Sequence, residues 1–178
     1  MTQLKKAFVL AGLALAASSM GAEAHPGHFG ASGLVSGFAH PFSGVDHIIA
    51  MVAVGFLAAR LGGRAVWSVP ATFVALMAMG GVWAILGLPM MCVEGGILLS
   101  MFVLPMVAVV RWKTPTATAM ALVGVFAVFH GYAHGLDMRA DASGFEFGIG
   151  FVVATALLHV AGLAAGFVAA RARTVLAA

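Results

Sequence analysis

Apolar residues run along this chain in five long blocks that are separated by short polar breaks. The blocks cover approximately residues 33–59, 66–87, 91–110, 116–136 and 146–170. A helix of about 20 apolar residues crosses the roughly 30 Å hydrocarbon core of a bilayer, and each block is close to this length. The pattern therefore predicts an all-α polytopic membrane helix bundle of about five transmembrane helices, with residues 25–178 forming a single transmembrane domain.

Composition agrees with this pattern and narrows the partners. Of the 178 residues, 62% are hydrophobic and only 8% are charged, whereas an average soluble domain has about 25% charged residues. The net charge of +3 comes mainly from basic residues beside apolar blocks, so we expect a lipid bilayer around the chain and no nucleic-acid partner. Cys92 is the only cysteine, which rules out a disulfide framework within one chain. The oligomeric state is left open.

The N-terminus has the features of a secretory leader. Lys5 and Lys6 precede a short apolar stretch, and residues 22–24, Ala-Glu-Ala, match the small-x-small pattern of a signal-peptidase site. We predict that residues 1–24 are a cleaved signal peptide, which leaves His25 as the first residue. The alternative is an uncleaved first helix, although the apolar core is short for a span.

The basic residues predict the orientation of the bundle. Pairs follow the first, third and fifth blocks, namely Arg60 with Arg64, Arg111 with Lys113, and Arg171 with Arg173. Because basic residues concentrate on the cytoplasmic side, these three ends share that side. We predict a multi-pass protein of the bacterial inner membrane with a periplasmic mature N-terminus and a cytoplasmic C-terminus. The connection near residues 87–90 and the loop at 137–145 then lie in the periplasm.

Ionisable side chains interrupt the first block, where a bilayer makes them costly. His40, Asp46 and His47 lie within eight residues. On an ideal helix His40 and His47 return to within about 20° of each other, whereas Asp46 points about 100° away from His47. Asp46 is therefore expected either to orient a histidine from behind or to reach the site through a local distortion, which Pro41 and Gly44 favour.

The fourth block carries a second polar stripe. His134 and Asp137 follow His130 by four and seven residues, so the three residues lie on one side of a helix over two turns. The predicted topology places both polar groups in the periplasmic half of the membrane, and Glu94, at the start of the third span, falls at a similar depth. Three helices thus contribute side chains of the kinds that bind metals at one level.

We predict a metal site from these residues in preference to a proton relay or a structural hydrogen-bond network. Its proposed ligand residues are His40, Asp46, His47, Glu94, His130, His134 and Asp137. Three further histidines are open between two roles. His159, in the fifth block, is either a second ion position or a packing donor. His25 and His28 either capture ions near the mature N-terminus or form a polar tail.

The types of side chain narrow the ion and argue against catalysis. Imidazole and carboxylate groups suit nickel, cobalt and zinc, whereas copper favours sulfur and magnesium favours oxygen. The chain contains neither a phosphate-binding Gly-x-x-x-x-Gly-Lys-Ser/Thr loop nor His-Glu-x-x-His nor a Gly-x-Ser-x-Gly elbow, so we expect no ATPase motor and no enzyme activity. The metal ion is then cargo, and no permanently bound cofactor is expected.

Two segments resemble the signatures of the HupE/UreJ family of nickel and cobalt permeases. His40, Asp46 and His47 match the pattern His, five residues, Asp-His, and residues 129–136 match Phe-His-Gly-x-Ala-His-Gly-x. Asp137 stands where the family pattern has glutamate, which shortens the last carboxylate by one methylene. The resemblance extends to the leader, the span count and the size, and so covers essentially the whole chain.

This resemblance implies secondary or facilitated uptake of Ni²⁺, or of Co²⁺ in some members, for hydrogenase, urease or cobalamin pathways. The residues themselves predict an intramembrane metal site that is open to the periplasm. The direction of transport and the preferred ion come from the resemblance. The alternatives are a membrane metallochaperone or sensor that does not transport, and an exporter of the same ions.

Overall fold

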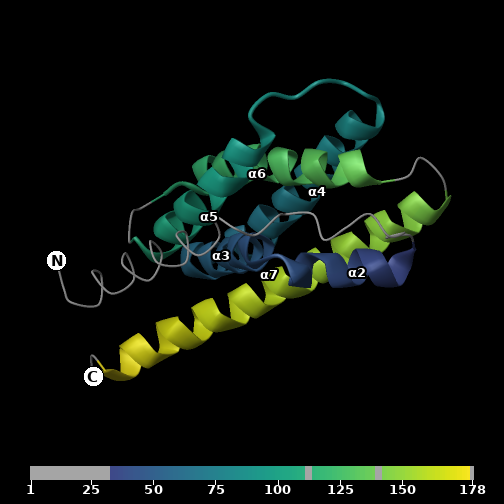
Figure 1. The fold of residues 1–178 in the computed structure, drawn as a ribbon. Coiled ribbons are helices and arrows are strands. Elements are labelled where there is room, and N and C mark those ends of the chain that lie inside the picture. Colours follow the sequence, from purple (N-terminus) through teal and green to yellow (C-terminus); the bar gives the residue numbers. More distant parts are fainter. Residues whose placement is uncertain (1–32, 111–113, 139–141, 177–178) are drawn as a thin grey trace. The chain divides into compact units, whose positions relative to one another are not determined.

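The computed structural model describes residues 33–110, 114–138 and 142–176, and all regular elements in these ranges are α-helices. They are α2 (Leu34–Ser43), α3 (Val45–Leu61), α4 (Ala65–Ile85), α5 (Val93–Val109), α6 (Thr116–Asp137) and α7 (Ala142–Leu176), as Figure 1 shows. The all-α polytopic class is confirmed. The predicted signal peptide, His25 and His28 lie outside the described residues.

Helix length and apolar composition identify the membrane spans. Helices α4, α6 and α7 are each long and apolar enough to cross a bilayer. Helices α2 and α3 meet at an angle of 87° and count as a fourth candidate span only if the bent pair is taken as one. Helix α5 has 17 residues, about 26 Å at 1.5 Å per residue, which is at the short end of the spanning range.

Close glycine contacts show that α4 and α6 run in the same direction. A Cβ atom added to Gly124 would lie 2.4 Å from a side-chain carbon of Leu76, and one added to Gly135 would lie 2.5 Å from the carbonyl oxygen of Gly81. Residue numbers thus rise together along both helices. Because α4 and α6 are parallel, α5 has to return the chain along the bundle between them, which supports counting this short helix as a crossing.

Helices α3 and α7 are also parallel and equally close. An added Cβ on Gly162 would lie 2.1 Å from the carbonyl oxygen of Val52, and one on Gly166 would lie 2.6 Å from the Cβ of Ala59. The first part of α7 packs against α2 in the same manner, because Gly37 lies against the backbone of Phe147. Figure 1 shows α2 lying along α7. Small residues at these crossings let the backbones approach, as is typical of membrane helices.

Candidate metal site

The break between α2 and α3 creates the first part of the site. Gly44 has an extended backbone, with φ −110° and ψ 125°, so one helix cannot continue through it. The Ser43 hydroxyl donates a hydrogen bond of 2.7 Å to the carbonyl of His40 near the end of α2. The ideal-helix estimate for His40 and His47 therefore does not apply, yet the bend brings their rings within 6.0 Å between centroids.

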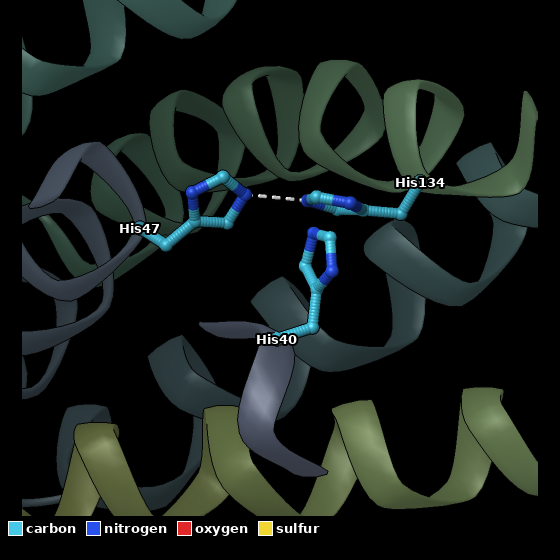
Figure 2. A group of neighbouring side chains, drawn as sticks. All are labelled: His40, His47 and His134. Carbon is cyan, nitrogen blue, oxygen red and sulfur yellow. Dashed lines mark hydrogen bonds between the residues drawn. The ribbon is translucent and has the colours of Figure 1, made fainter. Parts of the chain in front are cut away.

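His134 of α6 completes a group of three imidazoles with His40 and His47. The ring centroid of His134 lies 4.8 Å from that of His40 and 4.6 Å from that of His47. One ligand nitrogen from each of the three residues lies within 4.8 Å of the other two. Figure 2 shows the three rings converging, with His134 reaching the group from the helix opposite α2. Two segments that lie 87 residues apart thus supply one histidine cluster.

The spacing of these nitrogens is close to what a shared metal ion requires. The Nε2 atoms of His47 and His134 are 2.5 Å apart and share a hydrogen bond. Two imidazole nitrogens that are each about 2.0–2.1 Å from a metal ion lie roughly 3 to 4 Å apart. Binding an ion would thus separate this pair by about 0.5 to 1.5 Å and draw the third nitrogen inward by at most about 2 Å. Side-chain rotation alone can supply such a change.

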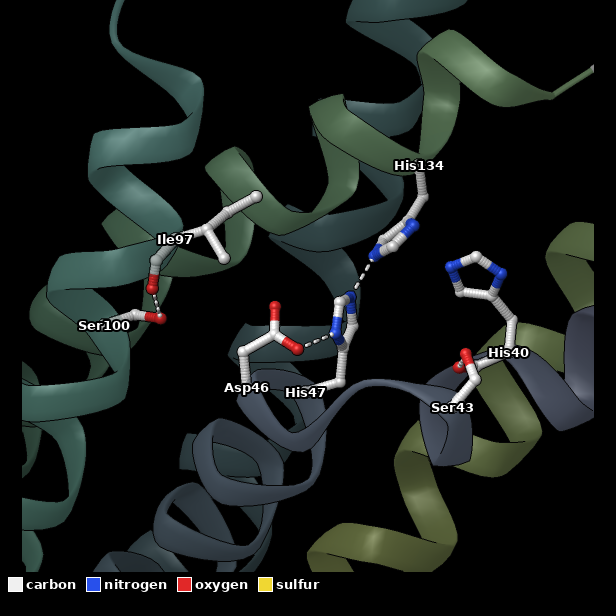
Figure 3. A network of polar contacts seen from close by, with 7 residues as sticks. All are labelled: His40, Ser43, Asp46, His47, Ile97, Ser100 and His134. Carbon is white, nitrogen blue, oxygen red and sulfur yellow. Dashed lines mark hydrogen bonds and ion pairs between the residues drawn. The ribbon is translucent and has the colours of Figure 1, made fainter. Parts of the chain in front are cut away.

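Asp46 holds one of the three rings in place. The Nδ1–H group of His47 donates a hydrogen bond of 2.9 Å to Oδ1 of Asp46, which directs Nε2 toward His134 (Figure 3). A carboxylate behind a ligating histidine fixes its tautomer and makes the ligand nitrogen more basic. Of the two roles that the sequence allowed for Asp46, the geometry matches the one behind the ring.

The cluster lies at the edge of an apolar groove. His47 and His134 are each 8% exposed. The groove has a volume of about 500 Å³ and is lined by residues of α4, α6 and α7, among them His134. Phe151 of α7 packs against His134 with centroids 4.5 Å apart, and Phe147 lies 5.5 Å from the His40 ring. The surrounding side chains are apolar, and a low-dielectric environment strengthens any charge interaction with a bound ion.

His130 is one turn before His134 and lies deeper in the protein. Its ring is fully buried, and Nδ1–H donates a hydrogen bond of 3.0 Å to the carbonyl of Phe126. Its Nε2 atom has no hydrogen-bond partner among the described residues. The His130 and His47 rings are 5.5 Å apart between centroids, so His130 is next to the three-histidine cluster without belonging to it.

The remaining predicted site residues take different positions. Glu94 lies exposed in the first turn of α5, and its role in metal binding stays a prediction. Asp137 ends α6, but the structure does not describe its side chain. His159 is 2% exposed in α7, and its closest ring neighbour is Phe73, at 5.2 Å between centroids.

Phe73, Phe147 and Phe151 are site neighbours that the sequence did not identify. Phe73 packs against the buried His159 and Phe151 against the buried His134, whereas Phe147 packs against the half-buried His40. The only available signal was the i, i+4 spacing of Phe147 and Phe151, which is equally typical of ordinary packing in an apolar span. Three imidazoles from two segments, one of them oriented by a carboxylate, define a helical membrane protein with a candidate divalent-metal site.

The comparisons with known proteins agree with this class. The family model described as HupE / UreJ protein matches residues 13–178. Protein HupE from Rhizobium leguminosarum bv. viciae is 45% identical over 151 residues, which cover 84% of this chain and 78% of that protein. The chain therefore belongs to the HupE/UreJ family. No solved structure matches it.

Proposed function

We propose that this protein imports Ni²⁺ or Co²⁺ across the inner membrane through the cluster of His40, His47 and His134. The observation that carries the proposal is the convergence of these three imidazoles, with ligand nitrogens within 4.8 Å of one another, inside an apolar helix bundle. Ionisable side chains inside a membrane are energetically costly, so their presence there indicates a functional site. Neutral imidazole is a common ligand of borderline divalent ions.

Family membership supports the ion and the direction of transport. The HupE/UreJ resemblance implies nickel or cobalt uptake, and both sequence signatures supply residues of the cluster. We infer that an ion from the periplasm exchanges part of its water shell for imidazole nitrogens. A change in helix packing then opens the opposite side. Binding has to remain weak enough for the ion to leave, and three neutral ligands with retained water satisfy that requirement.

Accumulation of radiolabelled nickel in cells with and without the protein tests the direction of transport. An importer raises the cellular content above that of cells that lack the protein. A chaperone or sensor leaves the content unchanged, and an exporter lowers it. Repeating the measurement with radiolabelled cobalt ranks the two ions. A result in which cells with the protein contain no more of either metal contradicts import.

Replacing Asp46 by asparagine should weaken metal binding without removing a ligand. In the wild type, His47 Nδ1–H donates a hydrogen bond of 2.9 Å to Asp46. The amide oxygen of Asp46→Asn can still accept this hydrogen bond, but the negative charge is lost. Loss of a group that supports a ligating histidine typically costs about 10–100-fold in metal affinity. Calorimetric titration of the purified protein with nickel measures this change. An affinity within twofold of wild type would show that the carboxylate does not tune the ring.

The single cysteine provides a test of the proposed orientation. Cys92 is exposed at the start of α5, next to the connection that we place in the periplasm. A membrane-impermeant maleimide should therefore label Cys92 in intact spheroplasts. The matched control carries Cys92→Ser and Ala172→Cys, which moves the thiol to an exposed position near the end of α7. The control should be labelled only after the membrane is opened, and the reverse pattern would overturn the orientation.

A further inference from the structure

The inner part of the bundle contains a buried histidine that the three-histidine cluster does not use. His159 is 2% exposed, and neither of its ring nitrogens has a hydrogen-bond partner among the described residues. One turn earlier on the same helix, Thr155 is fully buried, and its hydroxyl has no hydrogen-bond partner in the part of the chain that the structure describes. A buried polar group that lacks a hydrogen bond destabilises the fold, so two of them on one side of α7 make this side a candidate binding position.

Contact with an aromatic ring does not account for His159. The Phe73 and His159 rings meet edge to face at 88°, with centroids 5.2 Å apart, so one imidazole N–H can point at the face of the phenyl ring. Neutral imidazole has a second nitrogen that carries a lone pair and needs a donor or a cation. An apolar residue would fill the same space without this requirement, so packing alone does not explain a histidine here.

The position of His159 along the bundle relates it to the three-histidine cluster. We call this the outer cluster, because the predicted orientation places it nearer the periplasm. An added Cβ on Gly55 would lie 2.0 Å from the carbonyl oxygen of His159, so the two residues are at one level of the parallel helices α3 and α7. Gly55 follows His47 by eight residues, which is about 12 Å along α3. His159 thus lies about two helical turns beyond the level of His47, toward the end of α3 that carries Arg60.

A series of ring contacts connects the two levels. The His130 ring lies 5.5 Å from that of His47, and the Phe73 ring lies 6.0 Å from that of His130 and 5.2 Å from that of His159. Nε2 of His130 has no hydrogen-bond partner among the described residues. Two histidines with unused nitrogens therefore follow the outer cluster at increasing depth.

We propose that His159, with the Thr155 hydroxyl, is a second and inner binding position for the transported divalent ion, which reaches it from the outer cluster by way of His130. This proposal rests on the proposed function. An imidazole nitrogen and a hydroxyl oxygen leave most of the coordination positions to water, so the ion is held weakly. Several weak positions in series permit binding and release along one path.

The substitution His159→Leu tests this position, because it removes the ligand and introduces an apolar side chain that suits the buried environment. The purified wild-type protein in lipid nanodiscs should bind two nickel ions per chain in equilibrium dialysis. His159→Leu should bind one ion, with the affinity of the outer site unchanged. His47→Ala should also bind one ion, at the inner position. In cells, His159→Leu should lower nickel uptake at least about tenfold.

The outcomes separate this proposal from the proposed function. A wild-type protein that binds one ion, or a His159→Leu variant that still binds two, overturns the inner position. Uptake by His159→Leu within twofold of wild type shows that the position is not on the path. Failure of the wild-type protein to accumulate nickel contradicts the proposed function, while the number of bound ions still decides whether the inner position exists. Unchanged outer-site affinity in His159→Leu shows that the variant is folded.

Discussion

Replacing His47 by alanine should reduce nickel accumulation to the level of cells that lack the protein. His47 is the central ring of the cluster, because it contacts His134 through Nε2 and Asp46 through Nδ1. Its loss removes one of three ligands and leaves the Asp46 carboxylate without its partner. With two imidazoles left, the outer site should lose most of its affinity, and the expected fall in uptake is at least about 100-fold, or about 2.7 kcal/mol.

The comparison variant is His159→Leu, which removes a buried imidazole outside the three-histidine cluster. It should lower uptake about tenfold and keep the tighter binding event. Both variants should reach the membrane in wild-type amounts, as measured by immunoblotting. Only His47→Ala should lose the tighter binding event in a titration with nickel. Wild-type accumulation by His47→Ala would contradict the assigned role of the cluster. A higher accumulation than wild type would instead favour an exporter.

The polar pattern of the sequence was enough to select the three histidines that the structure brings together. His40, His47 and His134 stand out because charged and polar groups are rare in apolar spans, and the structure brings all three together. Helical geometry left two roles open for Asp46, since adjacent residues on a helix point about 100° apart, and the hydrogen bond from His47 matches the role behind the ring.

Other features depend on tertiary packing and could not be predicted. Nothing in the spacing of His40 and His47 indicates that the helix turns by 87° between them, although Gly44 and Pro41 indicated some distortion. The sequence grouped His130 with His134, because the two residues share one side of α6. In the structure only His134 joins the three-histidine cluster, whereas His130 donates its hydrogen bond to the carbonyl of Phe126 within α6. Which of two residues on one side of a helix meets a side chain of another helix depends on the packing of the bundle, and periodicity does not encode it.

The second large effect is expected from a substitution that adds one methyl group outside the site. A Cβ atom on Gly131 would lie 1.8 Å from the carbonyl oxygen of Met77 and 2.7 Å from its carbonyl carbon. These are backbone atoms, so no change of rotamer relieves the overlap, and α4 and α6 have to move apart. Overpacking of this kind costs about 1–3 kcal/mol. Gly131→Ala should therefore lower the Tm of the purified protein by several degrees.

The same displacement should impair transport, because His130 and His134 lie on either side of Gly131 in α6. Gly95→Ala is the matched control, since an added Cβ there has no heavy atom of the described residues within 4 Å apart from the adjoining backbone of its own helix. Alanine is favoured over glycine in a helix by about 0.5–1 kcal/mol, so this control should keep or raise the Tm and retain uptake. If Tm and uptake fall in Gly131→Ala but not in Gly95→Ala, the close contact between α4 and α6 holds the histidines in position. Equal Tm values for the two variants would mean that the helices can separate without cost.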